Sequence, residues 1–354
     1  MRTGAAAGHR GYLHEAVYYD SDEELLAVVV PFLLGGVAAG EPTLVALGER
    51  NAALVRRHLP DRTAVTYLAG DGVYARPAAA IRSYRRLLAD HVRAGAGQIR
   101  IIGEVPPAAL GATWDWWARY ESAINHAYDD FPLWSMCAYD RRVTPAPVLR
   151  DVARTHPRVA TPDGNHPTSA EYVDPATFLG EFRPVPADPV QRGTPVVELT
   201  DPTPAQARHA VRYADRGVLP REEVDDLSVA VSETVTNALR YGRPPVRVRF
   251  WAGVDRIVVT VSDGGSGPQD PYAGLLPTAE AARGGRGLWL VHQLCNHVVF
   301  ERGEGFTIRL TVGNPDPVEP TAGGPGPVEV TVGDAGPVEP DPEPAAPTPS
   351  GTPS

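Results

Sequence analysis

Strand-like and helix-like segments alternate along the first half of the chain, and this alternation limits the fold more than any other feature. Ser21, followed by three acidic residues, is typical of a helix N-cap before an apolar run. Because strands that alternate with helices build parallel sheets, residues 9–183 are predicted to form an α/β domain. The predicted strands are 43–47, 98–102 and 133–139, and the predicted helices begin near 22, 82 and 114.

A second pattern follows a proline-rich linker predicted at 184–194. In residues 195–312 a long helix precedes two adjacent strands and a glycine-rich stretch, so a domain of the α+β kind is expected. Four apolar residues recur at i+4 on the long helix and predict its buried face. They are Leu227, Val231, Val235 and Leu239. The predicted helices are 204–215, 222–241 and 288–295, and the predicted strands are 196–200, 246–251, 256–261, 298–301 and 306–312.

The segment 313–354 differs in composition from everything before it. It contains 12 prolines and seven acidic residues, with no basic and no aromatic residue. Such a segment cannot bury enough apolar surface to fold, so we predict a disordered tail and prefer a solubilising role to a binding one. Without its seven charges the net charge of −10 falls to −3 on residues 1–312.

All 33 basic residues are arginine, and the absence of lysine excludes several chemistries. A phosphate-loop NTPase needs a lysine on the phosphates, and Schiff-base enzymes need a lysine amine. The acidic excess argues against direct nucleic-acid binding. The two cysteines, Cys137 and Cys295, lie far apart and predict neither a disulfide framework nor a zinc site. The longest apolar stretch, 25–40, is too short to span a membrane, so a cytoplasmic protein is expected.

Three features of residues 195–312 point to a ligand site. Glu233 and Asn237 lie at i and i+4 on the long helix and share a face away from the apolar stripe. Asp263 ends a predicted strand and is followed by Gly265 and Gly267; its carboxylate can accept a hydrogen bond from the amine of adenine, and the glycines allow close approach. The glycine turn at 284–287 opens a helix whose free N–H groups form a phosphate site.

Together these motifs resemble the GHKL ATPase superfamily, and more closely its anti-sigma regulatory factor, or serine-protein kinase, branch. Residues 232–238 (Ser-Glu-Thr-Val-Thr-Asn-Ala) resemble the N box, Asp263-x-Gly265-x-Gly267 the first glycine box, and 285–290 (Gly-Arg-Gly-Leu-Trp-Leu) the second. The resemblance covers about 195–312. It implies a Bergerat-type α/β sandwich that binds ATP and Mg²⁺.

The resemblance also implies roles for single residues. Asn237 would coordinate Mg²⁺, Glu233 would be the catalytic base for a protein hydroxyl, and Asp263 would bind adenine. Residues 268–284 would form a mobile lid. Tyr241, which stands where relatives often carry histidine, is interpreted as a core residue. The other implied cofactor-binding residues are Gly265, Gly267, Gly285, Arg286 and Gly287.

The first domain resembles the MEDS sensory domain, which is thought to be related to the RecA-like fold without its phosphate loop. The resemblance spans about 9–180 and is carried by residues 18–25, 31–33, 40–41, 100–104 and 137–140; residues 105–107 depart from the expected pattern. Four residues could converge as a ligand or metal pocket. They are His14, Glu104, Glu121 and Cys137. Structural hydrogen bonds at strand ends are the simpler interpretation and are preferred.

These resemblances predict a sensor-coupled anti-sigma factor that works by partner switching. Its partners would be a sigma factor and an anti-anti-sigma protein of the STAS type, on which it would phosphorylate serine or threonine. Relatives of the ATP-binding domain commonly dimerise, so a homodimer is among the expected assemblies. Two alternatives stay open: an ATP-binding module without phosphotransfer, and a component similar to histidine kinases. The region before residue 222 contains His209 but no phosphoacceptor pattern, which disfavours the second.

Overall fold

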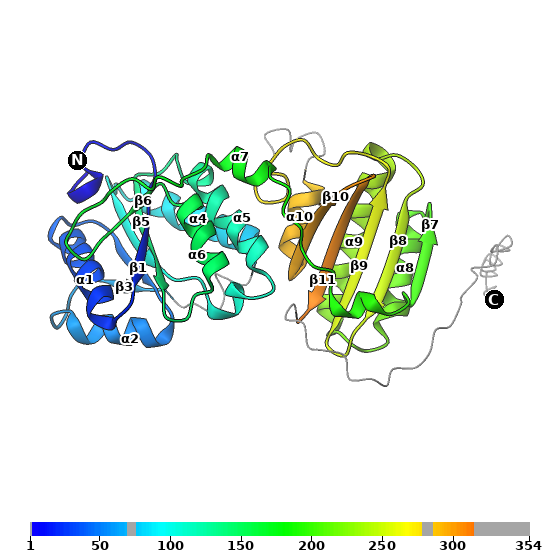
Figure 1. Ribbon diagram of the computed structural model, residues 1–354, viewed down its shortest axis with the longest axis horizontal. Helices are drawn as coiled ribbons and strands as arrows, with labels where there is room; N and C mark the ends of the chain where they lie inside the picture. Colours follow the sequence, from blue (N-terminus) through cyan, green and yellow to red (C-terminus); the bar gives the residue numbers. More distant parts are fainter. Residues whose placement is uncertain (1, 69–75, 278–285, 315–354) are drawn as a thin grey trace, which may run out of the picture.

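The computed structural model describes residues 2–68, 76–277 and 286–314. The predictions for Gly285, for the lid from residue 278 to 284 and for the tail from residue 315 lie outside these ranges. The described chain forms two domains side by side, each built on its own sheet (Figure 1).

The N-terminal domain is built on a six-stranded sheet in the order β3-β2-β4-β5-β1-β6, and every strand pair is parallel. This confirms the predicted α/β class. The strands are β1 (Leu13–Tyr19), β2 (Thr43–Ala46), β3 (Thr66–Tyr67), β4 (Ile99–Gly103), β5 (Leu133–Asp140) and β6 (Arg158–Val159). The helices are α1 (Asp22–Ala38), α2 (Glu49–His58), α4 (Pro77–Arg93), α5 (Trp114–Ala127), α6 (Ala146–Thr155) and α7 (Pro175–Gly180), and the 3₁₀ turns are η1 (Gly4–Ala6) and η2 (Pro107–Leu110).

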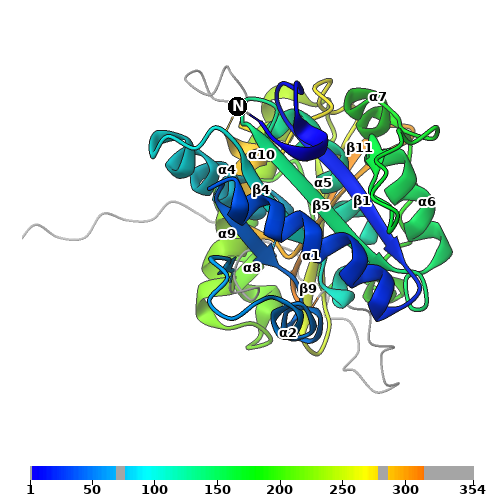
Figure 2. The same cartoon turned by 90° about the vertical axis from the view of Figure 1, so that its left-hand side faces the viewer.

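Helices cover both faces of this sheet, which gives the domain three layers (Figure 2). Successive side chains of a strand point to opposite faces. Ile101 therefore packs in the cluster that contains Tyr84 of α4, whereas Ile102 packs in the cluster that contains Leu33 of α1. Ser21 caps α1 as predicted, because its hydroxyl accepts a hydrogen bond from the Glu24 amide at 3.2 Å.

The C-terminal domain is built on a five-stranded sheet in the order β10-β11-β9-β8-β7, and every pair is antiparallel. Its helices pack against one face and share one apolar cluster with the strands (Figure 1). The predicted elements are confirmed within two residues at each end. The strands are β7 (Val197–Thr200), β8 (Arg247–Ala252), β9 (Arg256–Asp263), β10 (His297–Arg302) and β11 (Phe306–Gly313), and the helices are α8 (Pro204–Asp215), α9 (Arg221–Tyr241) and α10 (Gly287–Leu294).

The segment between the domains is held against the second sheet. It contains the 3₁₀ turn η3 (Pro189–Arg192). Asp188 pairs with buried Arg256 at 3.0 Å, and the Pro186 carbonyl and the Gln191 side chain accept hydrogen bonds from Arg309. These contacts place the linker across the sheet face that α8, α9 and α10 leave uncovered.

The apolar stripe predicted on α9 is correct only in part. Leu227, Val231 and Val235 are buried, but 48% of Leu239 is exposed. Each i+4 step advances about 40° around a helix, so three steps carry Leu239 away from the core face. Ala238 is buried there instead.

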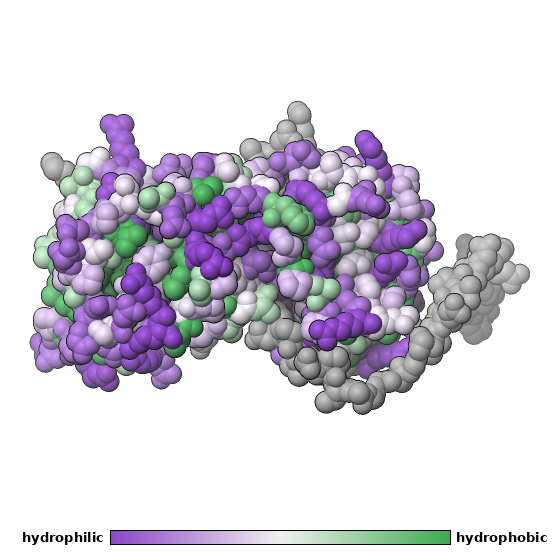
Figure 3. All heavy atoms as spheres, viewed as in Figure 1, coloured by the Kyte–Doolittle hydropathy of each residue, from purple (hydrophilic) through white to green (hydrophobic). Residues whose placement is uncertain are grey.

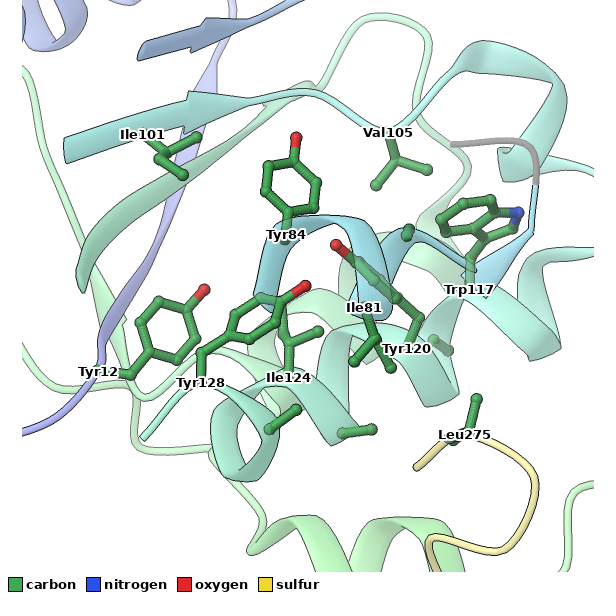
Figure 4. Packing of buried hydrophobic residues seen from close by; sticks show 14 of the residues in the cluster. Tyr12, Ile81, Tyr84, Ile101, Val105, Trp117, Tyr120, Ile124, Tyr128 and Leu275 are labelled. Atoms are coloured by element: carbon green, nitrogen blue, oxygen red, sulfur yellow. The ribbon is translucent and has the colours of Figure 1, made fainter. Parts of the chain in front are cut away.

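Each domain inserts one side chain into the core of the other. Trp116 of α5 is buried in the C-terminal apolar cluster, and its indole N–H donates to His292 Nδ1 at 3.2 Å. Leu275 belongs to the N-terminal cluster and lies on the same side of it as Trp117 and Tyr120 (Figure 4). His297 of β10 contacts Asp115 of α5 at 3.0 Å. Helix α5 therefore contacts the second domain through Trp116 and Asp115, and α4 also contacts it, where Arg82 lies over the Trp289 ring of α10.

The face in Figure 3 is mostly hydrophilic, with hydrophobic residues scattered between. The apolar side chains at the domain boundary, Trp116 and Leu275, are each only 1% exposed. Among the helices of the described residues, none combines the length and apolar character that crossing a membrane requires.

Candidate functional site

The first site is built on helix α9, which presents two different faces. Val231 and Val235 pack into the core, whereas Glu233 and Asn237 are half-buried on another face. Thr234 is also buried, and its hydroxyl donates a hydrogen bond to the Ala230 carbonyl of the same helix at 2.8 Å. The helix therefore carries a carboxylate and an amide, one turn apart, at the edge of the domain core.

The first residue of α10 lies directly against these two side chains. A Cβ added at Gly287 would be 2.8 Å from Glu233 Oε2 and 3.1 Å from Asn237 Nδ2. A larger residue at this position would push the ends of both side chains away from the start of α10. The first helical bond of α10 runs from the Leu290 amide to the Arg286 carbonyl, so the N–H groups before Leu290 lack helical partners. Arg286 precedes the helix and is exposed.

Asp263 is the last residue of β9, and its carboxylate organises the loop that follows. Asp263 Oδ1 accepts hydrogen bonds from the Gly265 amide at 2.6 Å and the Arg243 amide at 3.2 Å. Both bonds use the same oxygen, which leaves Oδ2 to accept a donor from a ligand. A Cβ at Gly265 would lie 2.7 Å from Oδ1, so the close loop also depends on glycine.

Gly267 has a φ of 72°, in the left-handed region that glycine favours. A Cβ at this position would be 2.4 Å from the Phe306 ring of β11. The backbone can therefore lie on the aromatic ring only because Gly267 has no side chain. Each glycine of the first glycine motif therefore lies where a side chain would collide with a neighbouring group.

A pocket of about 430 Å³ opens between α9, β9, the loop after it and α10. The volume falls within the usual range for small-molecule sites. Val261, Ile308 and Leu288 give it an apolar lining, while Asp263 and Asn237 supply polar groups at separate points of its wall. An apolar slot with a carboxylate for the amine of adenine, and an amide beside a helix N-terminus for phosphate and metal, fits ATP with Mg²⁺.

Tyr241 corrects the sequence prediction. It was expected in the core, yet 66% of its surface is exposed and it lines this pocket. Tyr241 is the last residue of α9 and follows Ala238, the last buried residue of the helix. Asp270, Ala273 and Gly274 of the predicted lid also line the pocket.

The described part of the lid contacts the N-terminal domain. The Tyr272 ring stacks on His126 with centroids 4.6 Å apart, and Leu275 is buried in the N-terminal cluster. Gly274 has a φ of 84°, and a Cβ there would be 2.4 Å from the His292 ring. Burial, together with Arg119 and His297, lowers the pKa of His292 to about 3. Nothing in the sequence pattern indicated that His292 supports the lid.

The second site is a buried cluster on the face of the N-terminal sheet that α5 and α6 cover. It brings together His14 of β1, Glu121 of α5, Cys137 of β5 and His156, which follows α6. Burial lowers the pKa of His14 well below its usual range and that of His156 to about 4. Burial also raises the pKa of Glu121 to about 7 and that of the Cys137 thiol well above its usual range.

The structure brings together three of the four residues that the sequence grouped. Glu104 is elsewhere: its carboxylate accepts hydrogen bonds from the Gly48 amide and the Asn51 side chain of α2. It follows β4, where the chain turns toward α2. His156 takes the fourth place, and no regular spacing to the other residues could have identified it.

Comparisons with known proteins match both domains. A family model described as the MEthanogen/methylotroph, DcmR Sensory domain (MEDS) matches residues 13–157, and the histidine kinase-like ATPase domain matches 199–312. The serine-protein kinase RsbW of Bacillus velezensis is 30% identical over 133 residues, which covers 32% of this chain and 83% of the relative. RsbW of Bacillus subtilis (strain 168) is 29% identical over 133 residues, with 32% and 83% covered. RsbW of Staphylococcus aureus (strain MSSA476) is 27% identical over 137 residues, with 32% and 84% covered.

Proposed function

Because this chain belongs, through its C-terminal domain, to the histidine kinase-like ATPases related to serine-protein kinase RsbW, we propose that it phosphorylates a serine or threonine of a partner protein with Mg-ATP. The observation that supports this most directly is the contact of Glu233 and Asn237 with the first residue of α10. The proposed base and metal ligand meet the free amide groups at the start of α10, and of these residues Asn237, Gly287 and Leu288 line the pocket.

Each residue of the site has a separate role in the proposed reaction. Glu233, which is half-buried, accepts the proton of the attacking hydroxyl, and Asn237 holds Mg²⁺ one helical turn away. The amides at the start of α10 receive phosphate oxygens, in place of the lysine that the chain lacks. Asp263 Oδ2 accepts the adenine amine. ATP supplies the phosphoryl group, and Mg²⁺ neutralises its charge.

The partner-switching role is the finer part of this proposal. In it the ATP-binding domain holds a sigma factor in one state and phosphorylates an anti-anti-sigma protein in the other. The N-terminal domain biases this choice, because α5 contacts α10 through Trp116 and His292 and packs against the lid through Leu275. A signal that shifts α5 therefore reaches both the helix that receives phosphate and the segment that covers it.

A second candidate function is ATP binding that holds a binding surface without phosphotransfer. It is supported by the half-buried Glu233 side chain, which has no hydrogen bond to orient it among the described residues. The same carboxylate argues against it, since a binding module has no need for a base beside its metal ligand.

The deciding experiment incubates the full chain with Mg-ATP and candidate anti-anti-sigma proteins, and measures transfer of labelled phosphate. Glu233→Gln should lower the rate by about 10²–10⁴-fold while ATP binding persists. Asn237→Ala should lose transfer through weaker binding of Mg-ATP. Glu223→Gln, an acidic residue in the first turn of the same helix, is the matched control and should behave like wild type.

Transfer at the wild-type rate by both Glu233→Gln and Asn237→Ala would contradict the kinase proposal. ATP binding with no transfer to any partner, in wild type and variants alike, would favour the second candidate. Capture of a sigma factor by the full chain, with and without ATP, tests the partner-switching role separately.

A further inference from the structure

The cluster at the centre of the N-terminal domain has the composition of a metal site. Two imidazoles, one thiol and one carboxylate face one another, and the ligand atoms of His14, Glu121, Cys137 and His156 all lie within 4.8 Å of one another. We propose that these four side chains bind a zinc ion. The proposal does not depend on the kinase activity of the other domain.

The distances between the ligand atoms suit tetrahedral coordination. His14 Nε2 lies 3.4 Å from Cys137 Sγ and 3.6 Å from Glu121 Oε2. Glu121 Oε2 lies 3.9 Å from Cys137 Sγ and 3.5 Å from His156 Nε2. Zinc bonds of usual length require separations of about 3.3–3.6 Å between ligand atoms at tetrahedral angles. The remaining separations are within 4.8 Å, so the four atoms lie close enough for a zinc ion to draw them into its coordination shell.

Neighbouring groups orient each histidine with a bare nitrogen toward this space. His14 Nδ1 lies 3.1 Å from Asn125 Oδ1. The Asn125 amide nitrogen donates to the carbonyls of Glu121, Ser122 and Thr155, which fixes the amide so that its oxygen faces His14. His14 therefore carries its proton on Nδ1, and its Nε2 is free to bind metal.

His156 is held in the same way. Its Nδ1 donates to the Val152 carbonyl at 2.9 Å, so Nε2 carries a lone pair. His156 is fully buried, and its Nε2 has no hydrogen-bond partner among the described residues. A buried acceptor without a donor is costly, and a metal ion would satisfy it. Glu121 is held as well, because its Oε1 accepts from the Tyr139 hydroxyl at 3.1 Å and leaves Oε2 to the cluster.

Charge favours a divalent cation. A carboxylate and a thiolate with two neutral imidazoles carry two negative charges, which Zn²⁺ balances. In the described part of the chain, no arginine forms an ion pair with Glu121; its pairs are with His14 and His156. The mixed nitrogen, sulfur and oxygen set also favours zinc over magnesium or calcium, which prefer oxygen ligands.

A nucleophilic thiol is the competing interpretation, because Cys137, His14 and Asn125 stand in the order of a Cys-His-Asn triad. Such a cysteine needs a lowered pKa and access for a substrate. Here desolvation raises the pKa of the Cys137 thiol. Cys137 is partly exposed, but His14 and Glu121 beside it are at most 1% exposed. The geometry thus favours a ligand over a nucleophile.

This proposal revises the expectation, drawn from the distance between the two cysteines, that the chain has no zinc site. The usual zinc spacing places pairs of ligands close together in one loop. Here every ligand comes from a different element: the pairing of β1 with β5 brings His14 next to Cys137, and α5 and the end of α6 add Glu121 and His156. A bound ion would join β1, β5, α5 and the end of α6.

The test uses the full chain. Protein from zinc-supplemented cells should contain about one equivalent of zinc, measured by mass spectrometry of the metal. After chelation, cobalt(II) is added as the probe. A thiolate-to-cobalt charge-transfer band and the intense visible bands of tetrahedral cobalt are expected, and zinc should abolish both.

Two cysteine variants give a matched comparison. Cys137→Ser should lose the charge-transfer band, whereas Cys295→Ser, which changes a cysteine buried in the other domain, should keep it. Asn125→Ala should weaken zinc affinity by about 10–100-fold through the misplaced His14. His156→Gln provides a second test if Cys137→Ser does not fold, as judged by circular dichroism.

The proposal is overturned if the wild-type chain shows no thiolate–cobalt band, or if Cys137→Ser and Cys295→Ser give the same spectrum. Rapid alkylation of Cys137 in a chain that takes up no metal would also overturn it, in favour of a reactive thiol.

Discussion

The two domains hold their polar groups in opposite ways. In the N-terminal cluster four side chains point inward, three of them at most 1% exposed, and neighbouring side chains and carbonyls orient them. In the C-terminal pocket part of the wall is formed by glycines, among them Gly267 and Gly287, where no side chain fills the space. The closed cluster suits a ligand small enough to be enclosed. The open pocket suits one that enters and leaves with every cycle.

Helix α5 belongs to both arrangements. Glu121 on its inner side is part of the closed cluster, and Trp116 one and a half turns earlier is part of the C-terminal core. Helix α5 therefore connects the cluster of the proposed sensory domain directly to the proposed ATP-binding domain. Three substitutions, taken from the largest expected effect to the smallest, and then a change of pH would break or sharpen this comparison.

Trp116→Ala removes the side chain that joins the two regions. Because Trp116 is 1% exposed within the C-terminal cluster, its truncation should lower the free energy of unfolding by about 3–5 kcal/mol. Trp116→Phe keeps an aromatic ring but loses the hydrogen bond to His292, and should cost much less. Urea denaturation of the full chain measures both. Equal, small losses for the two variants would show that the domains are not interlocked in solution.

Asp263→Asn tests the part of the open pocket that a side chain supplies. Asparagine can still accept the amides of Gly265 and Arg243, but it replaces the second oxygen with a donor. Affinity for ATP should fall by about 10–100-fold, as for a lost hydrogen bond to a charged group, with little loss of stability. Titration calorimetry measures this, and Asp225→Asn, exposed on α9, is the control. Unchanged affinity would remove Asp263 from the adenine site.

Gly267→Ala tests whether the absence of a side chain shapes the open pocket. The added Cβ would collide with the Phe306 ring at a φ of 72°, so the unfolding free energy should fall by about 1–3 kcal/mol. Gly303→Ala, in the turn before β11, meets nothing within 4 Å and should have little effect. Thermal denaturation compares the two variants. An unchanged unfolding free energy for Gly267→Ala would contradict the close contact between Gly267 and the Phe306 ring.

Acid should weaken the boundary between the regions through His292. Its pKa is lowered to about 3 in the folded chain, below the ordinary value of 6.5. Between these two pH values the imidazole is protonated in the unfolded chain and neutral in the folded chain. Stability should therefore fall as the pH drops below about 6.5 toward 3, by about 1.4 kcal/mol per pH unit from this residue. Urea titrations at several pH values measure the slope. His292→Gln should show a shallower slope, and an unchanged slope would contradict this account.

The residues of the proposed C-terminal site lie within local motifs, whereas those of the N-terminal cluster are far apart in sequence. Glu233 and Asn237 share one helix face, and Asp263 with its glycines occupies one strand end and its loop, so local patterns place each group. Where the prediction erred, at Leu239 and Tyr241, the error concerned which turns of α9 the sheet covers. The pattern within a helix does not contain that information.

By itself, the sequence determined the alternation of elements, the local shape of each motif and the absence of a lysine that other ATP sites use. Only the tertiary structure decided which distant residues meet. His156 joins His14, Glu121 and Cys137, Glu104 turns toward α2, and Trp116 enters the core of the other domain. The physical reason is that helix and strand periods act over a few residues. The order of strands in a sheet and the packing of one domain on another depend on the burial of the whole chain.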